Sequence, residues 1–169
     1  MKVEKTKLDG VLLITPPTIF EDFRGGYIEI YNQRLYSEAG INQNFMQDDI
    51  SFSKKDVLRG IHGDASTCKL VSCLEGAFFL VVVNNDPDSA QYRLWETHTL
   101  SEENRLQVLI PPKFGNAHLV LSERAIFHYK QTTEYNREGQ FTLLWNDPEL
   151  GIGWPIDSPI LSTRDAGDE

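Results

Sequence analysis

Alternating and continuous apolar runs dominate this chain, and they predict strands rather than helices. Lys69 alternates onto the same face as Val71 and Cys73, because successive side chains of a strand point to opposite sides. The run Ala77–Val83 is continuously apolar, which predicts a strand buried on both faces. Only Leu35–Gly40 carries a modest helical signal. The pattern therefore favours a β protein.

The same pattern extends along the chain. Ala125–Thr132 alternates and places Phe127 and Tyr129 on one face. Pro111–His118 is predicted as an irregular loop because it is rich in proline and glycine. The C-terminal tail is dense in turn formers, yet its apolar residues predict that it packs against the body. Further strands are expected at 11–14, Tyr27–Tyr31, Phe45–Ser53, Gln91–Leu100, Leu106–Pro111 and Phe141–Trp145.

Many short strands with regular turns and little helix predict one all-β domain over residues 1–169, with a double-stranded β-helix, or jelly roll, as the strongest candidate. A chain of 169 residues can bury an ordinary core. No apolar run approaches the roughly 18 residues of a membrane span. The first ten residues carry charges where a signal peptide needs an apolar region, so secretion by that route is not expected.

Charge and cysteine content narrow the partners and the compartment. The formal net charge of −9 argues against nucleic-acid binding but leaves room for a local basic pocket that holds a phosphorylated small molecule. Cys68 and Cys73 are the only cysteines, and their spacing places them on opposite faces of one strand. Two free thiols and a cytoplasmic location are therefore expected, and a C-x4-C pair alone is a weak zinc signal.

The candidate chemistry is concentrated in Val57–Gly76. This stretch places Arg59, His62, Asp64 and Lys69 within eleven residues. A lysine on an apolar strand face has two common explanations. It either lies on an edge strand, where its charge prevents pairing with another chain, or it is a buried cation that faces a polar cavity. Both interpretations fit Lys69 alone, and the nearby arginine and histidine favour the cavity.

Eleven short segments resemble, in order and over nearly the whole chain, the dTDP-4-dehydrorhamnose 3,5-epimerase family. The segments are F-E-D-F-R-G-G-Y-I-E, Q-D-D-I-S-F-S, V-L-R-G-I-H, K-L-V-S-C-L-E-G, S-E-E-N-R, I-P-P, Ala117-His118, L-S-E, F-H-Y-K, W-N-D-P-E-L-G-I-G-W-P and L-S-T-R-D. The resemblance implies a cupin-like jelly roll without metal or cofactor. It also implies an isomerase that inverts C3, C5 or both in a nucleotide-linked 4-keto sugar.

The resemblance also implies roles for single residues. His62 is the general base, Asp165 orients it, Tyr129 donates a proton on the opposite sugar face, and Lys69 steadies the enolate. A homodimer is implied as well, because two of the binding residues, Arg24 and Glu29, are expected to come from a partner subunit. The substrate-binding candidates are Arg24, Glu29, Gln47, Arg59, Asp64, His118 and Tyr135.

These residue types suit the implied reaction. A ketone at C4 acidifies the hydrogens on C3 and C5. Histidine, with an ordinary pKa of about 6.5, can remove one of them near neutral pH. Tyrosine, with an ordinary pKa of about 10, keeps its proton until an enolate carbon accepts it. A lysine ammonium places positive charge where the transition state develops negative charge.

Structural roles compete with each functional one. His62 could be a histidine satisfied within a turn, and Tyr129 could pack in the core beside Phe127. His118, placed in the predicted loop, could be structural. Arg24 could be a turn residue paired with a neighbouring carboxylate. His98 and His128 are interpreted as ordinary strand histidines.

Other protein classes also compete. A metal-dependent cupin oxygenase would need to hold iron, and only His62, Asp64 and His118 are available as ligands for it. A 3,4-ketoisomerase of the same substrate class and a non-catalytic sugar-binding jelly roll are further alternatives.

The chain departs from the family pattern at Gly63-Asp64, Gly26, Leu80, Asn84 and in a longer Lys113–His118 loop. We expect these departures to surround the pocket, so that fold and proton chemistry carry over better than the substrate. A GDP-linked 4-keto sugar is therefore an alternative to a dTDP-linked one.

Overall fold

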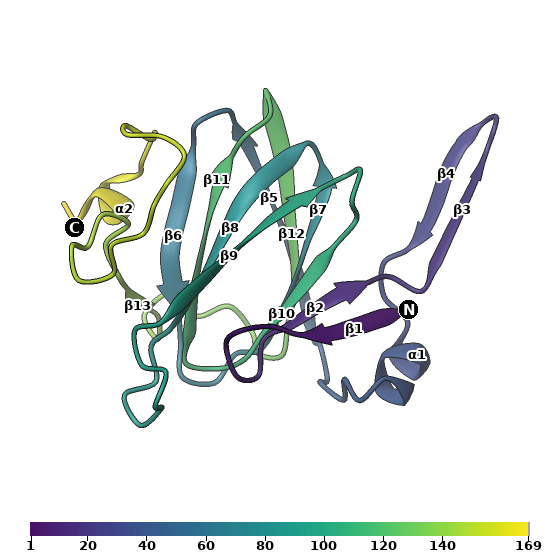
Figure 1. The fold of residues 1–169 in the computed structure, drawn as a ribbon, viewed down its shortest axis with the longest axis horizontal. Coiled ribbons are helices and arrows are strands. Elements are labelled where there is room, and N and C mark those ends of the chain that lie inside the picture. Colours follow the sequence, from purple (N-terminus) through teal and green to yellow (C-terminus); the bar gives the residue numbers. More distant parts are fainter. Residues whose placement is uncertain (169) are drawn as a thin grey trace.

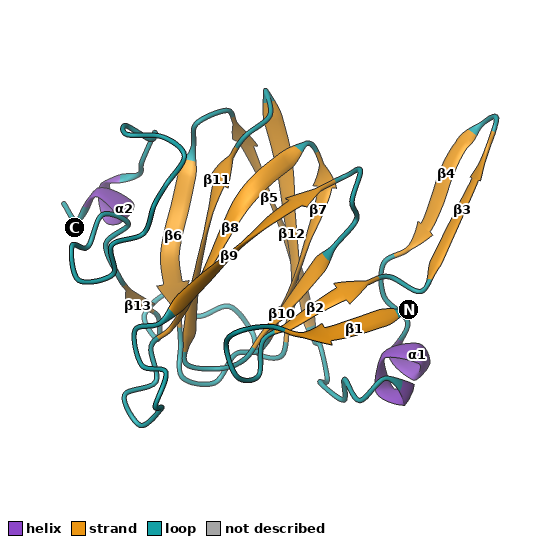
Figure 2. Cartoon of the chain, in the orientation of Figure 1, coloured by secondary structure: helices purple, strands orange, loops and turns teal. Residues whose placement is uncertain are grey.

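Two antiparallel sheets face each other in the computed structural model, which describes residues 1–168 with the side chain of Thr18 excepted (Figures 1 and 2). The six-stranded sheet has the order β1-β2-β10-β7-β12-β5, and the five-stranded sheet has the order β13-β6-β11-β8-β9. A separate two-stranded ribbon is formed by β3 and β4. This architecture confirms the predicted jelly roll.

The strands are short, as the spacing of the turn residues predicts. No helix of residues 1–168 is long and apolar enough to cross a membrane. The elements are β1 Lys2–Lys5, β2 Leu12–Thr15, β3 Thr18–Asp22, β4 Gly25–Glu29, α1 Gln33–Glu38, β5 Gln47–Lys54, β6 Leu58–Gly63, β7 Lys69–Glu75, β8 Ala77–Asn84, β9 Trp95–Ser101, β10 Gln107–Ile110, β11 Phe114–Val120, β12 Arg124–Gln131, β13 Phe141–Thr142 and α2 Thr163–Ala166.

Strand alternation determines which side chains enter the core. Val71 and Cys73 of β7 lie in the cluster between the two sheets, together with Phe127 of β12. Leu70, on the other face of β7, packs in a second cluster with Tyr36 of α1. The predicted alternation is therefore confirmed, and Lys69 shares the inner face. Both thiols are free, as predicted.

Strand β8 is buried on both faces, as its continuous apolar run predicts. Leu80 belongs to the cluster between the sheets, whereas Val81 belongs to a cluster on the outer face of the five-stranded sheet. The C-terminal tail covers that outer face with Ile152, Trp154 and other apolar side chains. The prediction that the tail packs on the body is confirmed.

The loop predicted at Pro111–His118 is wrong, because β11 begins at Phe114 and includes His118. The glycine that suggested a loop instead marks a close approach of two strands. A Cβ on Gly115 would lie 2.7 Å from Cγ2 of Ile61 on β6, so only glycine fits at this position.

Other elements also differ from the predictions. The strand expected from Gln91 begins at Trp95, because residues 91–94 form a turn in which Arg93 has a φ of 64°. The strand expected at Phe141–Trp145 has only two residues, Phe141 and Thr142. Strand β3, which follows two prolines, was not expected, and it exists because it pairs along its length with β4.

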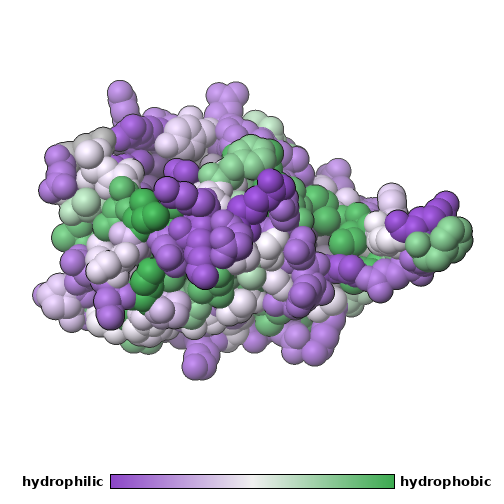
Figure 3. Space-filling model, turned by 90° about the horizontal axis from the view of Figure 1, so that it is seen from above, coloured by the Kyte–Doolittle hydropathy of each residue, from purple (hydrophilic) through white to green (hydrophobic). Residues whose placement is uncertain are grey.

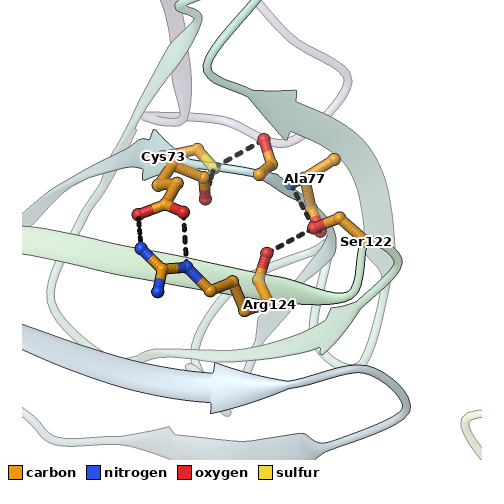
Figure 4. Close-up of polar contacts among 6 residues, drawn as sticks. Cys73, Ala77, Ser122 and Arg124 are labelled. Atoms are coloured by element: carbon orange, nitrogen blue, oxygen red, sulfur yellow. Dashed lines mark hydrogen bonds and ion pairs between the residues drawn. The ribbon is translucent and has the colours of Figure 1, made fainter.

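A tight turn at Gly76 connects β7 to β8 and so links the two sheets (Figure 4). Gly76 has a φ of 73°, and a Cβ there would lie 2.1 Å from the carbonyl oxygen of Arg124. The Ser122 hydroxyl donates to that carbonyl at 2.6 Å and accepts from the amide of Ala77 at 2.9 Å. Cys73 Sγ donates to two carbonyls of the same turn. The turn holds the end of the strand that begins with Lys69.

The β3–β4 ribbon, here called the arm, projects away from the two sheets (Figure 1). In the space-filling view it extends to the right and carries both apolar and polar surface (Figure 3). Phe23 at its turn is 98% exposed, and Phe20 and Tyr27 are also exposed. Arg24 pairs with Asp22 at 2.6 Å, as the turn interpretation predicts.

Candidate active site

A cavity of about 430 Å³ lies between the inner faces of the two sheets, with the C-terminal helix α2 at its rim. Strands β5, β7 and β12 contribute from one sheet and β6 and β11 from the other. The cavity is lined by Gln47, Asp49, Ile50, Ser51, Arg59, His62, Lys69, Asn116, His118, Phe127, Tyr129, Tyr135, Gln140, Ser162, Arg164 and Asp165.

His62 and Asp165 are in direct contact at the cavity wall. Nε2 of His62 lies 2.7 Å from Oδ1 of Asp165, although no aligned hydrogen bond joins them. Catalytic contacts in ligand-free sites are often poorly aligned. Ser162, the N-cap of α2, donates its hydroxyl to Asp165 Oδ2 at 2.9 Å. This N-cap places the carboxylate against β6.

Asp165 is built to stay ionised. Burial acts to raise the pKa of its carboxyl group, but the interactions with His62 and the hydrogen bonds from Ser162 and the Gly60 amide outweigh burial and lower the pKa. The side chain is 4% exposed, so its charge acts on His62 with little screening. Asp165 can therefore stabilise an imidazolium at His62.

Lys69 enters the cavity from the centre of the six-stranded sheet. Its strand β7 lies between β10 and β12, so Lys69 is not an edge-strand residue. Nζ donates to Oδ1 of Asn116 at 3.1 Å. Burial lowers the pKa of the amine, with a smaller lowering from Arg164, while Asp64 raises it. Of the two interpretations of Lys69, the structure therefore agrees with a buried lysine that faces a polar cavity.

Tyr129 faces the cavity from β12, in the sheet opposite to that of His62. Burial raises the pKa of the phenol, and the charge and hydrogen-bonding capacity of Asp49 raise it further. Lys69 Nζ lies 5.8 Å from the centre of the tyrosine ring. Tyr129 also packs against the core, beside Phe127, so its packing and functional roles are compatible.

His118 is buried on β11 and stacks on Phe127, with ring centroids 4.1 Å apart. Burial lowers the pKa of its imidazole to about 3, and nearby Arg59 adds to the lowering. The ring is therefore neutral near pH 7. Arg59 itself donates from Nε to Ser53 Oγ at 2.9 Å, which holds the guanidinium at the cavity wall.

Not every predicted site residue lies at this cavity. Gln47 and Tyr135 line it, and the Gln47 side chain accepts from the Tyr135 amide at 2.9 Å. Asp64 does not line it, because its carboxylate accepts from the amides of Ser66 and Thr67 and closes a turn. Arg24 and Glu29 lie on the arm, away from the lining.

Several lining residues are not predicted by the sequence pattern. Asn116 was assigned to a loop, and Gln140, Ser162 and Arg164 lie in segments without a periodic pattern. Asp49 could have been found, because alternation along β5 places it on the same face as Gln47.

The metal-ligand set considered for an oxygenase is not assembled, since Asp64 is committed to its turn. Within residues 1–168, no group of three or more histidine, cysteine, aspartate or glutamate side chains is placed to hold a metal ion.

Most departures from the family pattern lie outside the cavity, contrary to expectation. Leu80 is a core residue, and Asn84 is buried at the end of β8, where its side chain accepts from the Asp86 amide. Gly63 has no space for a side chain, because a Cβ would lie 2.2 Å from the carbonyl oxygen of Phe114. These three positions have packing or hydrogen-bonding roles and do not line the cavity.

Facing sheets that enclose a histidine–aspartate pair, a tyrosine and a buried lysine define an acid–base enzyme of the cupin-like jelly-roll class. A family model described as dTDP-4-dehydrorhamnose 3,5-epimerase matches residues 5–169. The chain belongs to this family, and the predicted isomerase class is thereby confirmed.

Individual members of this family are similar to the chain over nearly its whole length. The dTDP-4-dehydrorhamnose 3,5-epimerase of Salmonella typhimurium is 41% identical, over 98% of this chain and 93% of that protein. The Bacillus anthracis epimerase structure, with TDP and pyrophosphate bound, has a TM-score of 0.93 and 34% identity and covers 98% of this chain and 96% of that one. The Legionella pneumophila epimerase structure, in complex with dTDP-4-keto-L-rhamnose, has a TM-score of 0.92 and 38% identity. The match covers 98% of this chain and 90% of that one.

Proposed function

We propose that this protein inverts both C3 and C5 of a dTDP-linked 4-keto sugar, with His62 as general base and Tyr129 as proton donor. The observation that carries the proposal is the placement of these two side chains on opposite sheets of one cavity, with Asp165 2.7 Å from the histidine. Opposite placement is what inversion at carbon requires, since the proton leaves one face and returns to the other.

In the proposed reaction, the imidazole nitrogen of His62 that does not contact Asp165 removes a proton from the carbon next to the ketone. The carbon–hydrogen electrons form the enolate, and negative charge develops on O4. Lys69, held by Asn116, supplies positive charge to that oxygen. Tyr129 then gives its phenolic proton to the carbon from the far face, and solvent restores both side chains.

The remaining lining groups suit the nucleotide part of the substrate. Arg59 and Arg164 supply positive charge for a diphosphate at a cavity rim in a protein of net charge −9. Gln47, Tyr135 and His118 are the other proposed contacts. Asp64 acts at a distance, by raising the pKa of Lys69, rather than by touching the substrate.

A homodimer in which each arm completes the partner's site is proposed for the assembly. The apolar side chains of Phe20, Phe23 and Tyr27 are exposed on the arm, and such surfaces commonly mark an interface. Among the side chains that the structure describes, none makes a hydrogen bond with the buried Oε1 of Glu29. Delivery of Arg24 and Glu29 to a neighbouring cavity would give both side chains a role, and two-fold dimers are the commonest soluble assemblies.

The nucleotide is proposed to be dTDP rather than GDP. The expectation of GDP rested on departures around the pocket, and Leu80, Asn84 and Gly63 are explained by packing. The solved relatives with TDP or a dTDP sugar bound add support. A cytoplasmic location is proposed because both cysteines are free thiols.

The decisive experiment incubates the purified protein with dTDP-4-keto-6-deoxyglucose in deuterated water and follows the sugar by proton NMR. Deuterium at C3 and C5 together with inverted product supports the proposal. Inversion at one carbon alone would replace it with a mono-epimerase, and movement of the ketone to C3 would replace it with a 3,4-ketoisomerase. Binding without exchange would leave a sugar-binding jelly roll, and the GDP-linked sugar in parallel tests the nucleotide.

A further inference from the structure

Asp49 is a carboxylate in the cavity that the proposed reaction does not use. It lies on β5 and lines the cavity, and β5 is the direct neighbour of β12. In the register of these two strands, Asp49 is paired with Tyr129. Directly opposed residues of an antiparallel pair have their Cβ atoms about 5 Å apart, so the two side chains interact.

The surroundings of Asp49 hold it in place. Gln47, two residues earlier on the same face, donates from Nε2 to Oδ2 of Asp49 at 2.7 Å, and the Gln47 oxygen is itself occupied by the Tyr135 amide. One carboxylate oxygen is thus engaged by Gln47. The other lone pairs of the carboxylate can accept the phenolic hydrogen of Tyr129.

We propose that Asp49 is a positioning residue for Tyr129. Its negative charge slows the return of a proton from Tyr129 to the far face of the sugar. This slow step competes with hydrogen exchange on the near face, at His62. This inference rests on the proposed role of Tyr129 as proton donor. When Tyr129 gives up its proton, a phenolate forms beside the Asp49 carboxylate, and like charges at this distance repel. The Lys69 amine, 5.8 Å from the ring centre, acts in the opposite direction.

A partition between two outcomes follows. After His62 has taken a proton, the imidazolium can exchange it with solvent and return deuterium to the same face, without inversion. Inversion requires donation by Tyr129, which Asp49 disfavours. The wild-type protein should therefore deuterate substrate that keeps its configuration before inverted product accumulates.

The test replaces Asp49 by asparagine, which keeps the shape and removes the charge. The measured quantity is the amount of inverted sugar divided by the amount of deuterated sugar that keeps its configuration. Asp49→Asn should raise this ratio on the order of three- to tenfold, because the Tyr129 phenol becomes a stronger acid when no carboxylate repels its phenolate. Binding of dTDP, measured by calorimetry, should be unchanged. Asp49→Ser removes the same charge with a smaller side chain and should move the ratio in the same direction.

Asp48→Asn is the matched control. Asp48 is the preceding residue of β5, alternates to the other face and pairs with Lys130 at 2.7 Å, outside the cavity. This variant loses the same charge but should keep the wild-type ratio.

The outcomes separate this inference from the proposed function. An unchanged or lowered ratio in Asp49→Asn overturns the role of Asp49 if Tyr129→Phe still abolishes inversion. Weaker dTDP-sugar binding with an unchanged ratio also overturns it and makes Asp49 a substrate contact. Inversion that survives in Tyr129→Phe overturns the donor assignment itself.

Discussion

Nε2 of His62 on β6 lies 2.7 Å from Oδ1 of Asp165 in α2. The contact joins the middle of the chain to its end, and it exists because the tail packs on the outer face of the five-stranded sheet and returns to the cavity rim. Ser162 caps the short helix and bonds the carboxylate. The proposed catalytic base therefore depends on the docking of the last helix.

His62→Ala is expected to abolish deuterium exchange at C3 and C5, since loss of a general base commonly costs on the order of a hundred- to ten-thousandfold. Asp165→Asn should slow exchange strongly but less completely, because the imidazole remains while its charge partner is lost. NMR in deuterated water measures both. His98→Ala, whose ring pairs with Glu96 outside the cavity, is the control and should exchange normally. Wild-type exchange in His62→Ala would mean that another group removes the proton.

Tyr129→Phe is expected to retain exchange and lose inversion. The phenol is the proposed donor on the far face, whereas the ring can still pack beside Phe127. Deuterium content and inverted product are measured in the same sample. Normal formation of inverted product would remove Tyr129 from the donor role.

Lys69→Met is expected to lower the rate of exchange on the order of a hundred- to a thousandfold, because the enolate oxygen loses its positive partner. The pKa of the Lys69 amine is lowered by burial, so the charge is costly to the fold. Stability should therefore fall by no more than about 1 kcal/mol in urea unfolding. Lys130→Met, outside the cavity, is the matched control. Exchange at the wild-type rate in Lys69→Met would contradict the role.

His118 should make stability fall as the pH falls from about 6.5 to 3. The folded protein holds the ring neutral, with a pKa lowered to about 3 mainly by burial. The unfolded chain binds a proton near the ordinary pKa of about 6.5, so protonation favours unfolding within this window. The effect amounts to at most roughly 4 to 5 kcal/mol. His118→Phe keeps an aromatic ring on Phe127 and should flatten the slope of unfolding free energy against pH, and an unchanged slope would contradict the assignment.

The proposed exchange of arms predicts complementation between two defective variants. Arg24→Ala subunits keep His62, and His62→Ala subunits keep Arg24. If Arg24 acts on the partner's site, a mixed dimer contains one site with both residues intact. Co-refolding the two variants should then restore activity well above either variant alone. No restoration in a dimer verified by light scattering would mean that Arg24 acts within its own subunit or not at all.

Local pattern was sufficient for much of the fold. The alternation through Lys69, Val71 and Cys73 could be predicted because strand periodicity depends on neighbouring residues alone. The burial of β8 on both faces followed from its continuous apolar run. Strand β11 could not be predicted, because Gly115 is explained by the approach of Ile61 from another strand, which no local pattern shows.

The candidate site also has features that the sequence determines and features that only the tertiary structure determines. The sequence by itself determined which residue types were available, and the family resemblance connected His62 with Asp165 and Tyr129. Only the tertiary structure decided that Asp49 faces Tyr129 and that Asp64 closes a turn. The physical reason is that a side chain's face follows from local alternation, whereas its partner follows from the pairing of strands that are distant in the sequence.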